Sequence, residues 1–390
     1  MGSVDRQAIY ASNLIMKVED FISGTWRQQY QYKSFLPTLV NQPWNWDDPT
    51  INVLLEQATK ALGELNAFSL IVPDVDLFLK MHVLKEAQTS SRIEGTQTGI
   101  DEVLLPEEQI EPSRRDDWRE VHNYIDAMND AVDALVSLPL SNRLLRQTHT
   151  TLMRGVRGEH KQPGEFRTSQ NWIGGSNISD AVFIPPHHTD LPNLLSDLEA
   201  FWHNSAITVP HLIRIAISHY QFETIHPFLD GNGRIGRLLI TLYLISHGFL
   251  AKPSLYLSDF FERNRTNYYD ALMRARTAND LQHWIRFFLN GVAETAAKAR
   301  DTFQQILQLR TEVEQKIMGL GAKSVNAQRM LRVLYRYPVI RASAIEQELQ
   351  LSQPTVGGLL RKFQDLGILE ELTGGMRYRL YAFREYIRLF

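Results

Sequence analysis

Cysteine is absent from the chain, and its absence removes several kinds of chemistry. Without a thiol the protein forms no disulfide, has no thiol nucleophile and binds no zinc through cysteine. No run of about 18 or more apolar residues occurs, so the sequence predicts no membrane-spanning helix. The N-terminus lacks a basic start followed by an apolar run and therefore shows no secretory signal. We expect a cytoplasmic protein that has no membrane partner.

A strong net charge is missing as well, because 41 Lys and Arg nearly balance 44 Asp and Glu to give −3. A charge this small gives no reason, over the whole chain, to expect nucleic acid as a partner. The 390 residues are 44% hydrophobic and 22% charged, which is ordinary for a folded protein. A chain of this length is expected to form two or three domains.

Helical periodicity organises most of the chain. Apolar residues recur at three- and four-residue intervals in the segments 51–105, 118–154 and 191–320. A glycine-rich segment with short strand-like runs at 171–173 and 181–184 separates the last two and predicts a small β-hairpin. We therefore expect a mainly α fold. The predicted regions are an arm (1–50) that packs on a later domain, a helical region (51–110), a core domain (111–291), a linker helix (292–321) and a C-terminal domain (322–390).

The C-terminal domain has the pattern of a winged helix-turn-helix. Three predicted helices precede two alternating segments around Gly374-Gly375, a hairpin turn signal. Residues 324–390 carry ten basic and six acidic side chains, and Arg377 and Arg379 on the wing would suit phosphate contacts. The third helix offers only Arg361 and Lys362, both late in it. DNA binding, dimerisation with a second copy and protein docking all stay open for this domain.

The most informative segment is HPFLDGNGRIGR, residues 226–237. Pro227 ends one helix, and Gly231 and Gly233 leave N–H groups free to face an anion where the next helix begins. The dipole of that helix adds positive potential, so the segment predicts a phosphate-binding site. Arg234 and Arg237 are three residues apart on one helix face and can bind successive phosphates.

Two further side chains of this segment point to group transfer. Asp230 would repel a phosphate unless a divalent cation lay between them, and Mg²⁺ is the oxygen-preferring candidate. His226 lies just upstream, where an imidazole could accept a proton from an attacking hydroxyl. The pattern predicts attack of a hydroxyl on a polyphosphate.

This segment resembles the Fic (filamentation-induced-by-cAMP) motif, HxFx(D/E)GNGRxxR, and matches it at every defined position. Segments 163–167, 171–175 and 183–186 are similar to the substrate flap of that family, and residues 35–37 to an N-terminal region of a bacterial subgroup. The resemblance covers roughly residues 30–290. It implies a Fic-type all-helical core with a small β-hairpin flap.

The resemblance also implies a function, protein adenylyltransfer. AMP would pass from ATP, with Mg²⁺ bound by Asp230, to a Ser, Thr or Tyr hydroxyl of target proteins or of the chain itself. His226 would be the catalytic base, and Arg234 and Arg237 would contact the β- and γ-phosphates. The residues implied to bind the nucleotide are Asp230, Gly231, Asn232, Gly233, Arg234, Ile235, Gly236, Arg237, Tyr268 and Tyr269. Arg276 stands where relatives often have an asparagine on the adenine side.

The segment from Ser90 to Gly95 resembles the inhibitory helix motif of the family, (S/T)xxxE(G/N). Ser90, Glu94 and Gly95 meet it, and the predicted helix lies near residues 85–95. The resemblance implies that Glu94 pairs with Arg237 and deprives the γ-phosphate of its partner. In some relatives this glutamate positions a water that removes AMP, so the reverse reaction stays open.

The flap residues Ala181, Val182, Phe183 and Ile184 could hold an extended target segment by main-chain hydrogen bonds near His226. Other functions stay open from the sequence: a DNA-binding regulator whose Fic domain senses nucleotide, and transfer of UMP or phosphocholine. A Ser-His-Asp hydrolase is disfavoured because the chain has no G-x-S-x-G segment.

Overall fold

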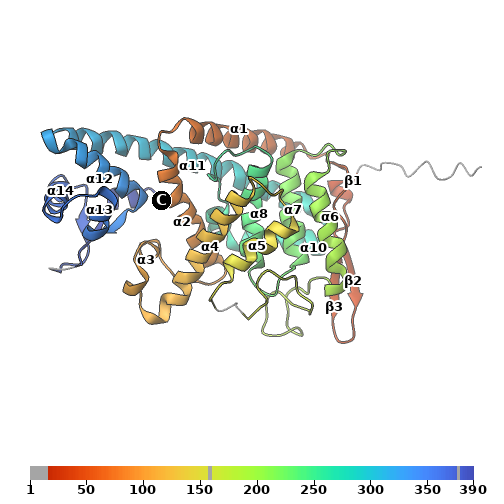
Figure 1. Ribbon diagram of the computed structural model, residues 1–390. Helices are drawn as coiled ribbons and strands as arrows, with labels where there is room; N and C mark the ends of the chain where they lie inside the picture. The colour runs from red at the N-terminus through yellow and green to blue at the C-terminus, as the bar shows by residue number, and fades with distance from the viewer. Residues whose placement is uncertain (1–15, 157–159, 376–377) are drawn as a thin grey trace, which may run out of the picture.

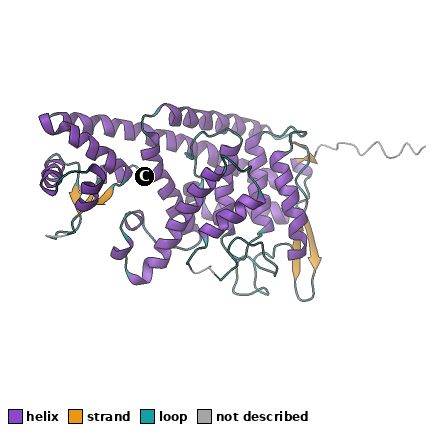
Figure 2. Ribbon diagram, in the orientation of Figure 1, coloured by secondary structure: helices purple, strands orange, loops and turns teal. Residues whose placement is uncertain are grey.

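Helices build almost all of the structure, which the computed structural model describes for residues 16–156, 160–375 and 378–390 (Figures 1 and 2). At the centre lie α7 (His211–Ile225) and α8 (Asn232–Ser246), whose side chains are almost all buried. The expected mainly α fold is confirmed. The other helices of the main body are α1 (Pro49–Ile71), α2 (Val75–Ile93), α3 (Ile100–Val103), α4 (Arg115–Ala134), α5 (Asn142–Leu152), α6 (Leu191–His203), α9 (Ser258–Arg263), α10 (Arg265–Ala278) and α11 (Leu281–Met318).

Local sequence signals place several helix ends where the site needs them. Asp48 caps α1 by accepting a hydrogen bond from the N–H of Thr50 at 2.8 Å. His226 ends α7 in the left-handed conformation, with φ 50°, and Pro227 follows it. Gly231, with φ 75°, precedes α8, and glycine adopts this conformation without the steric cost that other residues incur.

The helix predicted as a linker is longer than expected. Instead of starting at residue 292, α11 begins at Leu281 and runs unbroken to Met318. The helix continues through Gly291. A Cβ at this position would lie 2.7 Å from the ring of Phe260, so the absence of a side chain leaves room for that ring. The N-terminal part of α11 is buried in the core, and α1 packs along it.

The N-terminal arm contacts the main body and contains strands that the sequence pattern did not predict. A parallel pair joins β1 (Met16–Lys17) to β4 (Trp44–Asn45), and an antiparallel hairpin joins β2 (Gly24–Gln28) to β3 (Lys33–Pro37). Just before β2, Oγ of Ser23 donates a hydrogen bond to Oδ1 of Asn279 at 2.7 Å. The arm is therefore attached to the end of α10.

The C-terminal unit has the predicted order of three helices and a wing. Its sheet has three strands in the order β5-β7-β6, one more than expected, because the segment after Pro338 is extended and pairs with β7. Arg377, predicted to contact phosphate, lies outside the described residues. The elements are α12 (Ser324–Arg336), β5 (Val339–Arg341), α13 (Ala342–Leu349), α14 (Gln353–Asp365), β6 (Glu370–Glu371), β7 (Leu380–Ala382) and α15 (Arg384–Ile387).

Cations of the C-terminal unit face the main body. Three ion pairs join the two parts: Arg332–Asp74 at 3.0 Å, Arg341–Glu108 at 3.8 Å and Arg384–Asp101 at 2.9 Å. These arginines are engaged in contacts within the chain, which favours docking over DNA binding as their role.

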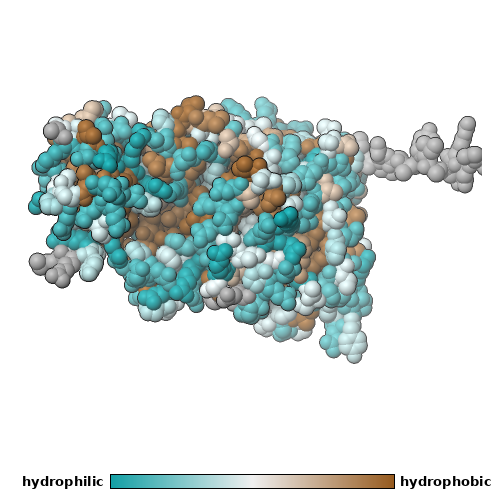
Figure 3. Space-filling view, viewed as in Figure 1, coloured by the Kyte–Doolittle hydropathy of each residue, from teal (hydrophilic) through white to brown (hydrophobic). Residues whose placement is uncertain are grey.

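An apolar groove also lies along this contact. Figure 3 shows apolar side chains gathered in the hollow between the main body and the C-terminal unit. The groove has a volume of about 940 Å³, and Leu84, Trp118 and Val339 are among its lining residues. Among the described residues, no helix is both long and apolar enough to cross a lipid bilayer.

Candidate active site

The segment between α7 and α8 folds into a tight loop closed by Asn232. The side chain of Asn232 is clamped to Phe228: the N–H of Phe228 donates to Oδ1 at 2.8 Å, and Nδ2 donates to the carbonyl oxygen of Phe228 at 2.8 Å. Asn232 is only 2% exposed. Its side chain therefore shapes the loop, and only its main chain is left to face a phosphate.

His149, which no sequence signal singled out, supports this loop from α5. The N–H of Gly164 donates to Nδ1 of His149 at 2.8 Å, and Nε2 lies 3.0 Å from the carbonyl oxygen of Asp230. The ring stacks on Phe228 with a centroid distance of 3.9 Å. Burial lowers the pKa of His149 to about 4, so the ring is neutral near pH 7. Since Nδ1 accepts, Nε2 carries the proton and donates to Asp230.

Arg167 and Asn171 hold the other side of the loop. Nε of Arg167 donates to the carbonyl oxygen of His226 at 3.0 Å, and Nδ2 of Asn171 donates to the same oxygen at 3.0 Å. Arg167 is 2% exposed, and burial lowers its pKa to about 10. Both residues lie in the flap-like segments noted in the sequence, although their attachment to the loop could not be read there.

His226 has the properties of a proton acceptor. Burial lowers its pKa to about 3, and the positive charges of Arg276 and Arg167 act in the same direction. The ring is therefore neutral near pH 7. Its Nδ1 is buried and has no hydrogen-bond partner among the described residues. A neutral imidazole can accept a proton from a hydroxyl brought next to its ring.

The structure brings Ser90 and Glu94 to Arg237. Nε of Arg237 donates to Oγ of Ser90 at 2.8 Å, and Nη2 donates to Oε1 of Glu94 at 2.7 Å. The Arg237 side chain is 2% exposed and that of Glu94 is 34% exposed. Burial acts to raise the pKa of Glu94, but the charge and hydrogen bond of Arg237 outweigh it and hold that pKa below its ordinary value. The Glu94 carboxylate is therefore ionised near pH 7.

The Glu94 carboxylate also lies against the first turn of α8. A Cβ placed on Gly233 would be 2.2 Å from Oε1 of Glu94. The positive charge of Arg234 acts on this carboxylate as well. The helix N-terminus predicted to bind a phosphate thus faces a carboxylate of the same chain, which is itself an anion at an anion-binding position.

Arg234 and Asp230 lie at the outer side of the loop. Arg234 is 3.3 Å from Glu120 and 3.6 Å from Asp230, and its side chain is 5% exposed. The Asp230 side chain is 47% exposed, and its Oδ1 accepts from the N–H of Gly231 at 2.6 Å. Glu120, on α4, is a partner of Arg234 that the sequence did not indicate.

The residues around Asp230 could hold Mg²⁺ only when a bound nucleotide supplies further oxygen ligands. Among the described residues, no group of three or more His, Cys, Asp or Glu could hold a metal ion. Asp230 offers one accessible carboxylate beside the nest of main-chain N–H groups. Mg²⁺ is commonly held by one or two carboxylates together with phosphate oxygens and water, and Asp230 fits that arrangement.

Three of the residues predicted to bind the nucleotide pack into the protein core. Ile235 is fully buried, and a Cβ on Gly236 would lie 2.2 Å from Oε1 of Glu223. Tyr268 is 1% exposed, and its hydroxyl lies 2.9 Å from Nε2 of His219. On α8, helical spacing places Ile235 and Gly236 on other faces than Arg234 and Arg237. Tyr269, which is 38% exposed, keeps a surface that could contact a base.

The predicted flap hairpin is reduced to one bridge between Ile173 and Phe183. Phe183 is 1% exposed, its ring lies 4.4 Å from the Arg276 guanidinium, and its N–H and carbonyl oxygen both bond to Ile173. The carbonyl oxygen of Ile184 accepts from the N–H of Phe35 in β3 at 2.9 Å. Of the four proposed docking residues, Ala181 and Ile184 are partly buried and only Val182, 64% exposed, is well exposed.

Comparison with known proteins supports the resemblance noted in the sequence. Residues 53–133 match the family model described as Fic/DOC family N-terminal, and residues 139–244 match the Fic/DOC family model. The protein adenylyltransferase Fic of Drosophila erecta is 30% identical over 200 residues, 50% of this chain and 36% of the relative. That of Culex quinquefasciatus is 34% identical over 133 residues, 34% of this chain and 24% of the relative. The chain thus spans about a third or less of these relatives.

Solved structures share the fold. A Fic family protein from Desulfovibrio desulfuricans G20 superposes with a TM-score of 0.55 at 22% identity, covering 88% of this chain and 98% of the other. A Fic domain-containing signaling protein from Bacteroides thetaiotaomicron gives a TM-score of 0.52 at 17% identity, covering 66% and 97%. The first match extends over most of the chain and therefore reaches beyond the segments matched by the family models.

Proposed function

We propose that this chain, in which residues 53–133 and 139–244 match Fic/DOC family models, transfers AMP from ATP to a hydroxyl of a target protein. The curated relatives it matches are protein adenylyltransferases, at 30% identity and partial coverage. The geometry around His226 supports the same reaction. We propose further that Glu94 inhibits the transfer in the conformation described.

In the proposed reaction, the neutral imidazole of His226 takes the proton from the target hydroxyl. The hydroxyl oxygen forms a bond to the α-phosphorus of ATP while the bond from that phosphorus to the bridging oxygen of the β-phosphate breaks. Pyrophosphate leaves and AMP stays on the target. Main-chain N–H groups at Gly231 to Gly233 stabilise the charge on the α-phosphate, and Arg234 binds the β-phosphate.

The observation that carries this proposal is the pairing of Arg237 with Ser90 and Glu94. In this arrangement Nε and Nη2 of Arg237 donate to groups of the same chain, and the Glu94 carboxylate lies where phosphate oxygens would approach Gly233. Productive binding of a triphosphate requires Glu94 to leave. A charge-assisted pair with one partner this deeply buried is stronger than an exposed one, so inhibition should be substantial.

Intact-mass analysis after incubation with ATP and Mg²⁺ tests the function. We expect little modification of the wild type, addition of AMP to Glu94→Gly, and none to Glu94→Gly/His226→Ala. Glu111→Gly, which changes an exposed glutamate outside the site, is the matched control and should behave as the wild type. Equal labelling of Glu94→Gly and the double variant would refute the role of His226. Equal labelling of wild type and Glu94→Gly would refute the inhibition.

A further inference from the structure

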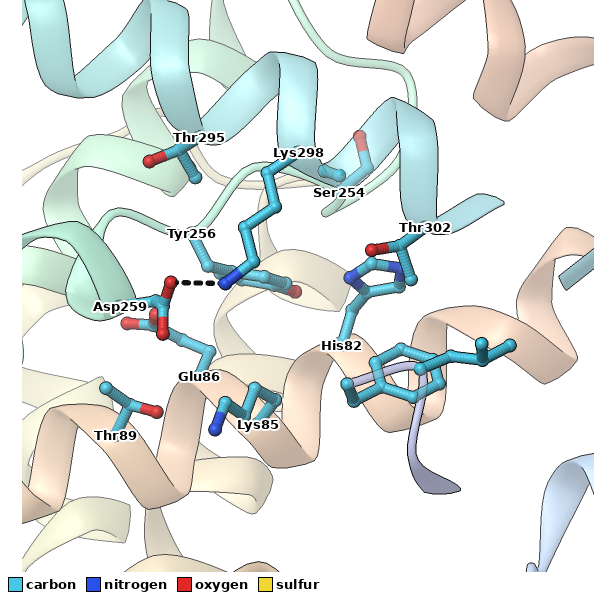
Figure 4. A pocket seen from close by; sticks show the side chains of 13 residues that line it. His82, Lys85, Glu86, Thr89, Ser254, Tyr256, Asp259, Thr295, Lys298 and Thr302 are labelled. Atoms are coloured by element: carbon cyan, nitrogen blue, oxygen red, sulfur yellow. Dashed lines mark hydrogen bonds and ion pairs between the residues drawn. The ribbon is translucent and has the colours of Figure 1, made fainter. Parts of the chain in front are cut away.

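A small cavity lies beside the inhibitory helix α2 and is lined by several of its polar side chains (Figure 4). It has a volume of about 70 Å³ and is enclosed by α2, α11, the segment before α9 and the last residues of the chain. Figure 4 shows side chains of α2 and α11 converging on it from two sides. Its polar lining residues are His82, Lys85, Glu86, Thr89, Ser254, Tyr256, Asp259, Thr295, Lys298 and Thr302.

Several buried polar groups of this lining have no hydrogen-bond partner in the part of the chain that the structure describes. These are Oγ of Ser254, the hydroxyl of Tyr256, Oγ1 of Thr295 and Nε2 of His82. Ser254 is 1% exposed, and Tyr256 and Thr295 are each 8% exposed. Leaving a buried polar group unsatisfied costs about 1–3 kcal/mol, and native proteins rarely leave several such groups together. Their convergence on one cavity indicates that something polar fills it.

The two carboxylates that line the cavity accept hydrogen bonds from neighbouring side chains, whereas the two lysines that line it keep N–H groups without an acceptor among the described residues. Glu86 accepts from Tyr124 and Ser258, and Asp259 accepts from Lys298 at 2.7 Å. Lys298 keeps further N–H groups. Lys85 makes no ion pair with the described residues that surround it, and burial lowers its pKa. The cavity therefore presents ammonium and hydroxyl donors to whatever it holds.

We propose that this cavity binds a small oxyanion the size of inorganic phosphate. A metal ion is a poor fit, because the described residues include no cluster of three metal-ligating side chains and the nearby carboxylates are engaged. An apolar ligand would leave the four polar groups unsatisfied. A nucleotide exceeds the volume. Three hydroxyls, one imidazole and two ammonium groups match the several acceptor atoms of a tetrahedral oxyanion.

Because the cavity lies beside α2, an oxyanion bound there would regulate AMP transfer; this consequence rests on the proposed function. Thr89 lines the cavity, and the next residue, Ser90, binds Arg237. An oxyanion that joins α2 to α11 stabilises α2 in the position in which Glu94 also reaches Arg237. A ligand that binds one conformation better than the other shifts the population toward it, so occupancy of this cavity lowers AMP transfer.

Calorimetric titration of the full chain with inorganic phosphate in a chloride buffer tests binding. We expect saturable binding to the wild type, and at least tenfold weaker binding to Ser254→Ala/Thr295→Val and to Lys85→Met. Arg234→Ala removes a phosphate-binding side chain of the candidate active site and should bind phosphate like the wild type. Thr311→Val, on the exposed face of α11, is the matched control for the threonine change.

Two results would overturn the site. One is the absence of saturable binding, which would mean that water alone fills the cavity. The other is binding that is lost in Arg234→Ala and kept in Ser254→Ala/Thr295→Val, which would place the phosphate at the start of α8. Denaturant unfolding gives a second readout, because removing two unsatisfied hydroxyls should leave the phosphate-free variant at least as stable as the wild type.

The regulatory consequence has its own test, and the binding measurement needs no catalytic activity. Phosphate should reduce AMP transfer by the wild type several-fold and leave Ser254→Ala/Thr295→Val unaffected. If both proteins are inhibited equally, phosphate competes with ATP and the regulatory link is refuted. A chain that binds phosphate in the cavity but transfers no AMP in any variant would refute the proposed function and leave the site standing.

Discussion

Ser90 and Arg237 are joined by a hydrogen bond of 2.8 Å between Oγ and Nε, 147 residues apart in the chain. The bond holds the guanidinium in place beside Glu94. Ser90→Ala should therefore weaken the inhibition without abolishing it. Hydrogen bonds to charged groups contribute about 1.5–3 kcal/mol, which corresponds to an increase in AMP transfer of roughly 10- to 150-fold, below that of Glu94→Gly. Initial rates with labelled ATP measure it.

The neighbouring Ser91 offers a matched control for this change. It lies in the same turn of α2 and is equally buried, but its Oγ has no hydrogen-bond partner among the described residues. Ser91→Ala should transfer AMP at the wild-type rate. A rise as large as that of Ser90→Ala would show that loosening of α2, rather than release of Arg237, explains the effect.

A second prediction concerns His149. Replacing it with alanine removes hydrogen bonds to Gly164 and Asp230 and the stacking on Phe228. We expect a loss of stability of roughly 2–4 kcal/mol, since a buried ring and its bonds disappear together. In the Glu94→Gly background, AMP transfer should fall because the loop that carries Asp230 and Gly231 loses its support. Urea unfolding and steady-state kinetics measure the two effects.

His160→Ala serves as the control, because His160 is an exposed residue close to Gly164 in the sequence. It should leave both stability and transfer unchanged. A His149→Ala protein that keeps full activity at temperatures where it stays folded would refute the supporting role and leave only a contribution to packing.

The sequence predicted what lies close together along the chain. His226, Asp230, Gly233 and Arg237 belong to one short segment whose helix ends follow from Pro227 and the glycines, so their proximity could be read directly. Helical spacing likewise predicted most of the central helices. These features depend on local chemistry alone.

The contacts that escaped prediction join distant segments. His149 lies 81 residues from Asp230, and Phe35 lies 149 residues from Ile184, although each pair is hydrogen-bonded. Tyr268 matched a family position, yet its place on the buried side of α10 depends on packing against Phe261 and Trp284. Which face of a helix meets the core is set by tertiary packing, and no local signal records it.

A third prediction follows from Glu223, a buried residue of α7. Burial raises its pKa to about 7 from the ordinary value of 4.5. Between about pH 4.5 and 7 the Glu223 carboxyl keeps its proton in the folded state and has lost it in the unfolded state. The free energy of unfolding therefore falls as pH rises through that window. The difference corresponds to roughly 3 kcal/mol. Glu223→Gln should therefore gain stability relative to the wild type as pH rises, measured by urea unfolding across the window.

The exposed residue Glu56 provides the comparison. Glu56→Gln should follow the pH dependence of the wild type. If the difference in unfolding free energy between Glu223→Gln and wild type stays constant across the window, Glu223 is ionised throughout and the interpretation is wrong.

A fourth prediction uses pH to test the link between Arg276 and His226. The guanidinium of Arg276 is buried, donates to Oγ1 of Thr224 at 3.1 Å and lies over Phe183, and it has no carboxylate partner among the described residues. Burial is the main cause of the low pKa of His226, about 3, and the charge of Arg276 is the next. Arg276→Met keeps an unbranched apolar chain over Phe183 and removes the charge. The pKa of His226 should then rise, by about one unit or more.

The outcome appears in the acid limb of the pH–rate profile, because only the neutral imidazole accepts a proton. In the Glu94→Gly background, the pH at which AMP transfer falls to half should move upward in Arg276→Met. Arg274→Met, an exposed change on the same helix that removes an ion pair with Asp280, should not move it. A purely structural role for Arg276 would lower the rate at every pH by the same factor. An unshifted acid limb would therefore separate Arg276 from the protonation of His226 and leave burial and the charge of Arg167 as the causes of its neutral state.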